Sequence, residues 1–296
     1  MYDIVILTEK KYINPIYKDW YTNQVILEDK LLMDSLLKKN LKVCKKDWAD
    51  SHFDWTKTKY AIFRTTWDYF ERYDEFFNWL EKTKHKTRFI NSYDLIKWNI
   101  DKYYLRELSN KEINIPPTLF LTKSQNTSLT QLFNQTQWDE VVLKPTISGA
   151  ARETYRINKS NHTKYEEIFQ KLISKENMIF QEFQKNILKL GEISLIIIGG
   201  EFTHAVKKKA KKGDFRVQDD HGGTVEKYVP NSLEISFAEK CIKKCPSEPL
   251  YARVDIIYDN NNSISLCELE LIEPELWLRN SEISTNKLSD EILKII

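Results

Sequence analysis

The first 95 residues alternate short apolar runs with segments whose apolar side chains recur at helical spacing. The runs occupy residues 3–8, 41–44, 60–63 and 89–90, and the helical pattern occupies residues 26–39 and a segment that ends at Trp79 and Leu80. Strands that alternate with helices usually form a parallel sheet with helices on both faces. We therefore predict an α/β domain over residues 1–96.

The rest of the chain mixes helices with hairpins, which predicts an α+β arrangement. Residues 193–198 and 202–208 predict one hairpin, and residues 251–258 and 264–271 predict a second. Further strands are expected at 119–121, 141–143, 154–157 and 178–183, and helices at 98–108, 129–133, 165–173, 233–244 and the C-terminal end. We expect a central unit over residues 97–185 and a C-terminal unit with a mixed sheet over residues 186–296.

Charge and hydropathy argue against several classes of protein. The 296 residues carry 45 Lys and Arg against 43 Asp and Glu, a net charge of +2, which is too balanced for a general nucleic-acid or membrane-surface binder. The lysine run at 207–212 could bind nucleic acid. This is only a minor alternative, because the whole chain is rich in lysine and the run is not distinctive. The longest apolar stretch, 195–198, is far below the roughly 20 residues of a spanning helix.

The N-terminus and the cysteines indicate the compartment. The sequence MYDIVILTEK lacks the basic start and the long apolar run of a signal peptide. The four cysteines form no CxxC pair, and Cys241 and Cys245 are more simply explained as two buried thiols than as metal ligands. We expect a cytoplasmic protein in a reducing environment.

Glycine is scarce, which makes the few glycines informative. All seven lie between Gly149 and Gly223. Gly199 and Gly200 fit an ordinary hairpin turn, whereas Gly149 lies in a loop of small residues at 146–151. Such a glycine provides either a left-handed backbone or close approach to a ligand.

Two strands of the second hairpin carry a concentration of carboxylates. Glu268 and Glu270 share one face of their strand, because side chains alternate with period two, and Asp255 is expected opposite residues 266–268. Three converging carboxylates destabilise the fold unless a cation intervenes. Oxygen-only ligands favour Mg²⁺ or Mn²⁺ over zinc, and Arg253 beside them suits an anionic ligand. The alternative is a solvated polar face.

A polar string follows the third apolar run of the N-terminal domain. Arg64, Thr66, Trp67 and Asp68 fall where a parallel sheet presents the carboxyl ends of its strands, which is where ligands bind in such folds. We interpret these four residues as candidates for recognising a small polar substrate. An ordinary loop anchored by the tryptophan is an equally good reading of the string.

Taken together, the motifs resemble the ATP-grasp superfamily over nearly the whole chain. The strings that carry the resemblance are RTTWDY, WNIDKYYL, VVLKP, FQEF, GDFRVQ and RVD…ELELIEP. They are most similar to glutathione-synthetase-like proteins, and within these to the cyclo-ligase type that forms D-cycloserine. The resemblance implies an N-terminal α/β domain, a central lid and a C-terminal metal-binding domain with the nucleotide between them.

The resemblance also assigns roles to individual positions. It implies that Asp255, Glu268 and Glu270 hold the metal, although relatives often carry Asn at the position of Glu270. Lys208, Arg216 and Arg253 are implied to grip the transferred phosphate and the acyl phosphate. The residues implied to bind ATP are Lys102 and Lys144 (phosphates), Ser148 and Gly149 (mobile loop), Gln181, Glu182 and Phe183 (adenine hinge, Gln181 and Phe183 through their backbone) and Glu192 (ribose).

These residues predict an ATP- and Mg²⁺-dependent ligase that joins a small carboxylate to an amine through an acyl phosphate. Two anions must be brought together, so the chemistry is electrostatic, and neither a Walker A string nor GxGxxG is present. A small-molecule kinase and a non-catalytic nucleotide-binding scaffold remain alternatives. The resemblance further implies small-molecule partners and a possible homodimer.

Overall fold

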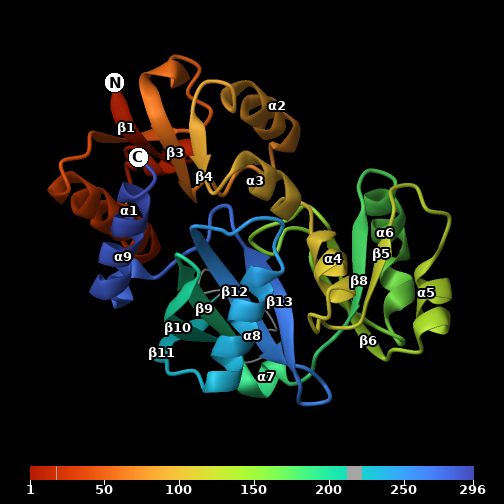
Figure 1. Ribbon diagram of the computed structural model, residues 1–296. Coiled ribbons are helices and arrows are strands. Elements are labelled where there is room, and N and C mark those ends of the chain that lie inside the picture. Colours follow the sequence, from red (N-terminus) through yellow and green to blue (C-terminus); the bar gives the residue numbers. More distant parts are fainter. Residues whose placement is uncertain (18, 212–221) are drawn as a thin grey trace.

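The computed structural model describes residues 1–17, 19–211 and 222–296, and it contains three β-sheets that surround a common centre (Figure 1). The first sheet lies in the N-terminal unit, the second in a lid, and the third in the C-terminal part. The predicted α/β class with an α+β C-terminal part is confirmed. Within the described ranges, no helix is both long enough and apolar enough to span a bilayer.

The N-terminal sheet is parallel throughout, with strand order β2-β1-β3-β4. Its strand β1 is buried on both faces: Ile4 and Ile6 face the helix α1, whereas Val5 and Leu7 pack in a second core with α2. This explains the continuous apolar run, which is typical of parallel strands. The bounds are β1 (Tyr2–Thr8), α1 (Trp20–Lys38), β2 (Val43–Asp47), β3 (Thr58–Thr65), α2 (Tyr73–Thr83) and β4 (Arg88–Ile90).

The lid is a four-stranded antiparallel sheet with order β5-β8-β6-β7. Leu143 and Phe180 on this sheet pack against Phe133 of α5 and Phe169 of α6, so two helices cover the same core. The bounds are β5 (Thr118–Leu121), α5 (Leu129–Thr136), β6 (Glu140–Pro145), β7 (Tyr155–Asn158), α6 (Glu166–Ile173) and β8 (Met178–Glu182).

The third sheet has order β11-β10-β9-β12-β13, and all its described pairings are antiparallel, whereas a mixed sheet was expected. Hairpin connections join β9 to β10 and β12 to β13, and a hairpin requires antiparallel neighbours. The bounds are α7 (Ile187–Leu190), β9 (Glu192–Ile198), β10 (Glu201–Lys209), β11 (Thr224–Tyr228), α8 (Ser232–Lys243), β12 (Tyr251–Tyr258) and β13 (Ile264–Glu270).

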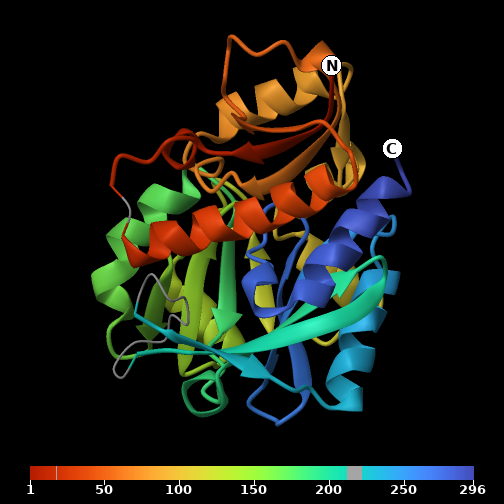
Figure 2. The same cartoon turned by 90° about the vertical axis from the view of Figure 1, so that its left-hand side faces the viewer.

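The C-terminal helix α9 (Glu282–Leu293) returns to the N-terminal unit and lies beside α1 (Figure 2). Leu288 and Ile292 join one buried core with Leu32 of α1, and the Ser35 and Ser289 hydroxyl oxygens lie 2.7 Å apart. The N-terminal unit therefore shares a core with the end of the chain. Division at residues 96 and 185 remains a prediction.

One predicted helix is wrong in its bounds. Residues 98–108 were expected to form a continuous helix, but the structure has α3 (Tyr93–Asn99) and α4 (Tyr104–Asn110). The backbone N–H of Lys102 donates to the Thr146 carbonyl (3.0 Å), which takes this residue out of the helical pattern. The short strand β11 was not predicted.

Candidate active site

A cavity of about 400 Å³ lies where the three sheets meet. Trp67 lines it from the loop after β3, Lys144 from β6 of the lid, and Glu268 from β13. A pocket at such a junction of units is the usual place for a ligand site. The predicted site residues that line the cavity are Trp67, Lys102, Lys144, Ser148, Gly149, Gln181, Glu182, Phe183, Glu192, Lys208, Arg253, Glu268 and Glu270.

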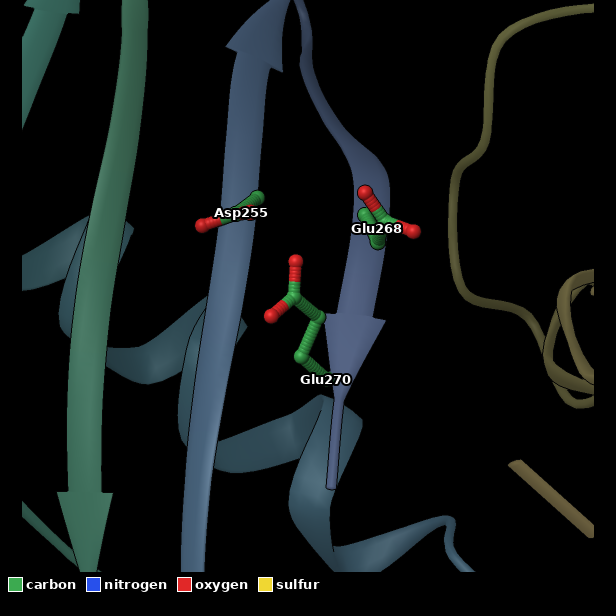
Figure 3. Close-up of side chains that lie close together, drawn as sticks. All are labelled: Asp255, Glu268 and Glu270. Carbon is green, nitrogen blue, oxygen red and sulfur yellow. The ribbon is translucent and has the colours of Figure 1, made fainter. Parts of the chain in front are cut away.

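The three predicted metal ligands come together between β12 and β13 of the second hairpin (Figure 3). Asp255 pairs with Glu268 across the two strands, as the sequence predicted, and each of the three side chains offers a carboxylate oxygen within 4.8 Å of the others. Asp255 is 1% exposed and lies below the cavity surface, whereas Glu268 and Glu270 are half-buried at its edge.

Basic side chains surround these carboxylates. Arg253 Nε donates to both Asp255 oxygens at 3.0 Å, and the same guanidinium forms an ion pair with Glu270. Lys208 Nζ lies 3.4 Å from Asp255, and Lys102 Nζ lies 3.0 Å from Glu268. The cluster therefore contains alternating charges of both signs, taken from strands β10, β12 and β13 and from the break before α4.

The carboxylates titrate very differently because of these neighbours. Burial alone would raise the pKa of Asp255, but Arg253 and Lys208 hold that pKa below its usual value. Lys102 and Lys144 likewise outweigh burial and lower the pKa of Glu268. Burial raises the pKa of Glu270 to about 8; Arg253 opposes this rise, while Glu268 and Asp255 add to it. The negative charge at Glu270 is thus incompletely compensated, so the donor set fits a divalent cation with oxygen ligands.

Lys102, in the break before α4, holds the small-residue loop at 146–151. Lys102 Nζ donates to the Ser148 carbonyl at 2.5 Å, and Ser148 Oγ donates to the Arg152 carbonyl at 2.9 Å. Ala150 and Ala151 have positive φ angles of 48° and 55°, an uncommon conformation for residues other than glycine. The loop therefore has a strained backbone, and Lys102, which is not part of the loop, holds it in place.

In the predicted adenine hinge, some backbone groups are already hydrogen-bonded within the protein. The Phe183 N–H donates to the Glu140 carbonyl at 2.9 Å, and the Phe183 carbonyl accepts from Asn260 Nδ2 at 3.1 Å. Gln181 pairs with β5 and β6 on its two sides. Adenine recognition by Gln181, Glu182 and Phe183 stays a prediction.

Glu192, predicted at the ribose, is 7% exposed and forms an ion pair with Lys208. Burial raises the pKa of Glu192 more than Lys208 lowers it. Lys208 therefore has two carboxylate partners within the protein, and its predicted role at the transferred phosphate stays a prediction. Arg216 lies outside the described residues.

Of the four predicted substrate residues, only Trp67 lines the cavity. Arg64 is buried and donates to the Pro274 carbonyl at 3.1 Å, and the Asp68 carboxylate accepts from Trp48 Nε1 at 2.7 Å. Thr66 is fully buried. The roles proposed for Arg64, Thr66 and Asp68 stay predictions.

Several residues that line the cavity were not predicted from the sequence, among them Tyr12, Tyr21, Tyr69, Glu273 and Trp277. Burial raises the pKa of Glu273 to about 7 in spite of a hydrogen bond to Tyr69. Both Tyr69 and Glu273 belong to strings already singled out, RTTWDY and ELELIEP, so their place in these motifs was the available signal.

The sequence matches the RimK-like ATP-grasp domain over residues 101–296, and the chain belongs to this family. Residues 4–91 match the N-terminal domain of D-cycloserine synthetase DcsG. The chain is an ATP-grasp ligase.

Individual relatives agree with this classification. The cycloserine biosynthesis protein DcsG of Streptomyces lavendulae is 27% identical over 251 residues, which are 80% of this chain and 83% of that protein. The crystal structure of D-cycloserine synthetase DcsG is similar with a TM-score of 0.85 and 20% identity, covering 99% of both chains. A D-alanine–D-alanine ligase from Bacillus anthracis is similar with a TM-score of 0.69 and 15% identity, covering 99% of this chain and 97% of that one.

Proposed function

We propose that this ligase forms a C–N bond between a small amino-acid-like carboxylate and an amine, through an acyl phosphate. The observation that carries the proposal is the meeting of Asp255, Glu268 and Glu270 with Lys102 and Lys144 at one cavity. Phosphoryl transfer between two anions needs this combination of cations and a metal site. The likeness to a cycloserine biosynthesis protein, over 80% of this chain and 83% of that protein, supports a small-molecule substrate.

The atoms balance in two steps. A carboxylate oxygen of the substrate attacks the γ-phosphorus of ATP, and the bond to ADP breaks. The amine nitrogen then attacks the acyl carbon, inorganic phosphate leaves, and the nitrogen loses a proton. Lys102 and Lys144 are proposed to hold the phosphates, and Arg253 to steady the acyl phosphate. If the product is a ring, the acyl carbon and the amine belong to one substrate molecule. If two substrates are joined, the acyl carbon and the amine belong to different molecules.

The metal ligands are proposed to be Asp255, Glu268 and Glu270. A divalent cation at these residues would neutralise phosphate charge during transfer. Burial of the cavity between three sheets would keep water from the acyl phosphate.

Product analysis tests the proposal. A panel of small carboxylates is screened with ATP and Mg²⁺, with and without an added amine such as hydroxylamine, and ADP and free phosphate are both quantified. We expect equal amounts of ADP and phosphate, formed only when the carboxylate is present and an amine is either added or carried by the same molecule. ADP without free phosphate would instead identify a kinase. Nucleotide binding without turnover of any carboxylate would support a scaffold.

A further inference from the structure

Gly149 contacts the N-terminal unit directly. A Cβ atom added at Gly149 would lie 2.5 Å from Cε1 and 2.7 Å from Cδ1 of Phe70, distances that real Cβ atoms essentially never show. The φ angle of Gly149 lies outside the left-handed region, so backbone conformation does not require glycine here. The requirement is space for the aromatic ring.

Phe70 lies where the N-terminal core reaches the cavity. Its side chain is 7% exposed and packs in the core of β1, β3 and α2, with the ring centroid of Tyr69 at 5.5 Å. Both Phe70 and Gly149 line the cavity, and Ile147 of the small-residue loop packs against the same core. The ring therefore supports the loop from the side of the N-terminal unit.

The opposite support comes from Lys102, which holds the Ser148 carbonyl. Between these two supports, Ala150 and Ala151 adopt left-handed conformations that cost free energy and persist only when their surroundings impose them. A loop with two fixed supports presents its backbone N–H groups in one place, which is the requirement for binding phosphate oxygens.

We propose that Phe70 is a positioning residue for the nucleotide: its ring sets the place of residues 148–151 over the β- and γ-phosphates. The inference rests on the proposed function, because it assumes that ATP occupies this cavity. It adds a contribution of the N-terminal unit to nucleotide binding through a residue that touches the loop rather than ATP.

Three variants test the contact: Phe70→Ala, Gly149→Ala and the double variant. Affinities for AMP, Mg·ADP and the non-hydrolysable Mg·AMP-PNP are measured by calorimetry on the full chain. We expect Gly149→Ala to lose about tenfold in affinity for Mg·AMP-PNP, the equivalent of one hydrogen bond to a charged group, with AMP affinity unchanged. Because Phe70→Ala removes the clashing atoms, the double variant should bind Mg·AMP-PNP more tightly than Gly149→Ala alone.

Phe77→Ala is the matched control, because Phe77 lies on α2, stacks on Tyr73 and does not line the cavity. It should leave all three affinities unchanged. Two outcomes would overturn the inference if the wild type binds nucleotide. One is that the losses of Mg·AMP-PNP affinity in Phe70→Ala and Gly149→Ala add up in the double variant. The other is that the variants lose as much affinity for AMP as for Mg·AMP-PNP. A wild type that binds none of the three would overturn the proposed function itself. If Gly149→Ala does not fold, unchanged Mg·AMP-PNP affinity in Phe70→Ala would refute the inference independently.

Discussion

At the scale of single residues, the site depends on compensation of buried charge. Asp255 is held ionised by Arg253 and Lys208, whereas the pKa of Glu270 is raised to about 8 by burial, with Arg253 opposing the rise and two neighbouring carboxylates adding to it. Charges that are buried together destabilise a fold unless each finds a partner. The carboxylate cluster is therefore better explained as a binding site for a cation than as a feature that stabilises the fold.

Glu268 is the most direct test of the metal assignment. We expect Glu268→Ala to lower kcat at least about 100-fold. Mutation of residues that only hydrogen-bond to metal ligands already lowers metal affinity or activity about 10–100-fold, and a direct ligand should matter more. Folding should be retained, as the side chain is half-buried at the cavity edge. The measurement is turnover against Mg²⁺ concentration together with thermal unfolding, and Glu226→Ala, on the exposed strand β11, is the control. Full activity of Glu268→Ala would remove Glu268 from the metal site.

Arg64 is expected to act on stability. Its side chain is 1% exposed, lies 3.6 Å from Glu28 and donates to the Pro274 carbonyl. Removing one partner of a buried ion pair typically costs 3–5 kcal/mol, and because Arg279 also pairs with Glu28 we expect Arg64→Met to lower the free energy of unfolding by about 3 kcal/mol.

Denaturant unfolding measures this loss. Lys59→Met, which breaks the exposed ion pair with Asp3, should change the free energy of unfolding by less than about 1 kcal/mol. A stable Arg64→Met variant with a raised KM for substrate would return Arg64 to the substrate site.

At the scale of elements, local patterns predicted most strands and the carboxylate hairpin. Period-two alternation placed Glu268 and Glu270 on one face, and the structure confirms the register with Asp255. The break between α3 and α4 could not be predicted, because it depends on a hydrogen bond from Lys102 to Thr146, which is distant in sequence. The same reason hid Trp277, whose place in the cavity depends on how the chain returns after β13.

The helix α9 provides a test of the core that the C-terminal end of the chain shares with the N-terminal unit. Leu288 is fully buried in the core that α9 shares with α1 and β1. A buried leucine truncated to alanine costs about 2–5 kcal/mol, so we expect Leu288→Ala to destabilise the protein by that amount. Leu293→Ala, on the same helix but 45% exposed, should cost much less. Equal unfolding midpoints for the two variants would contradict the shared core.

At the scale of the whole molecule, His204 connects the third sheet to the C-terminal segment. Its Nε2–H donates to the Leu276 carbonyl at 2.9 Å, and its Nδ1 lies 2.8 Å from Ser284 Oγ, which suits a neutral ring. Burial lowers the pKa of His204 below 6.5, and the hydrogen bonds to the backbone only partly oppose this. Protonation of the ring is thus less favourable in the folded state than in the unfolded one.

The sign of the pH effect follows from this difference. The unfolded state takes up a proton near pH 6.5 and the folded state only at a lower pH, so stability from His204 is present above pH 6.5 and is lost as the pH falls below it. We expect His204→Gln to flatten the decline in unfolding free energy below pH 6.5 by up to about 1.4 kcal/mol per pH unit. His52→Gln, at an exposed loop position, should leave the profile unchanged. Parallel profiles of wild type and His204→Gln would contradict the assignment.

At the proposed nucleotide site, Lys102 in the break before α4 would make nucleotide entry a competition. Lys102 already contacts the Ser148 carbonyl and Glu268, so a triphosphate at the proposed site would have to displace partners that the protein itself supplies. The affinity for nucleotide would then be the difference between two sets of contacts, and a cation that draws Glu268 away from Lys102 would free this lysine for the proposed phosphate contact.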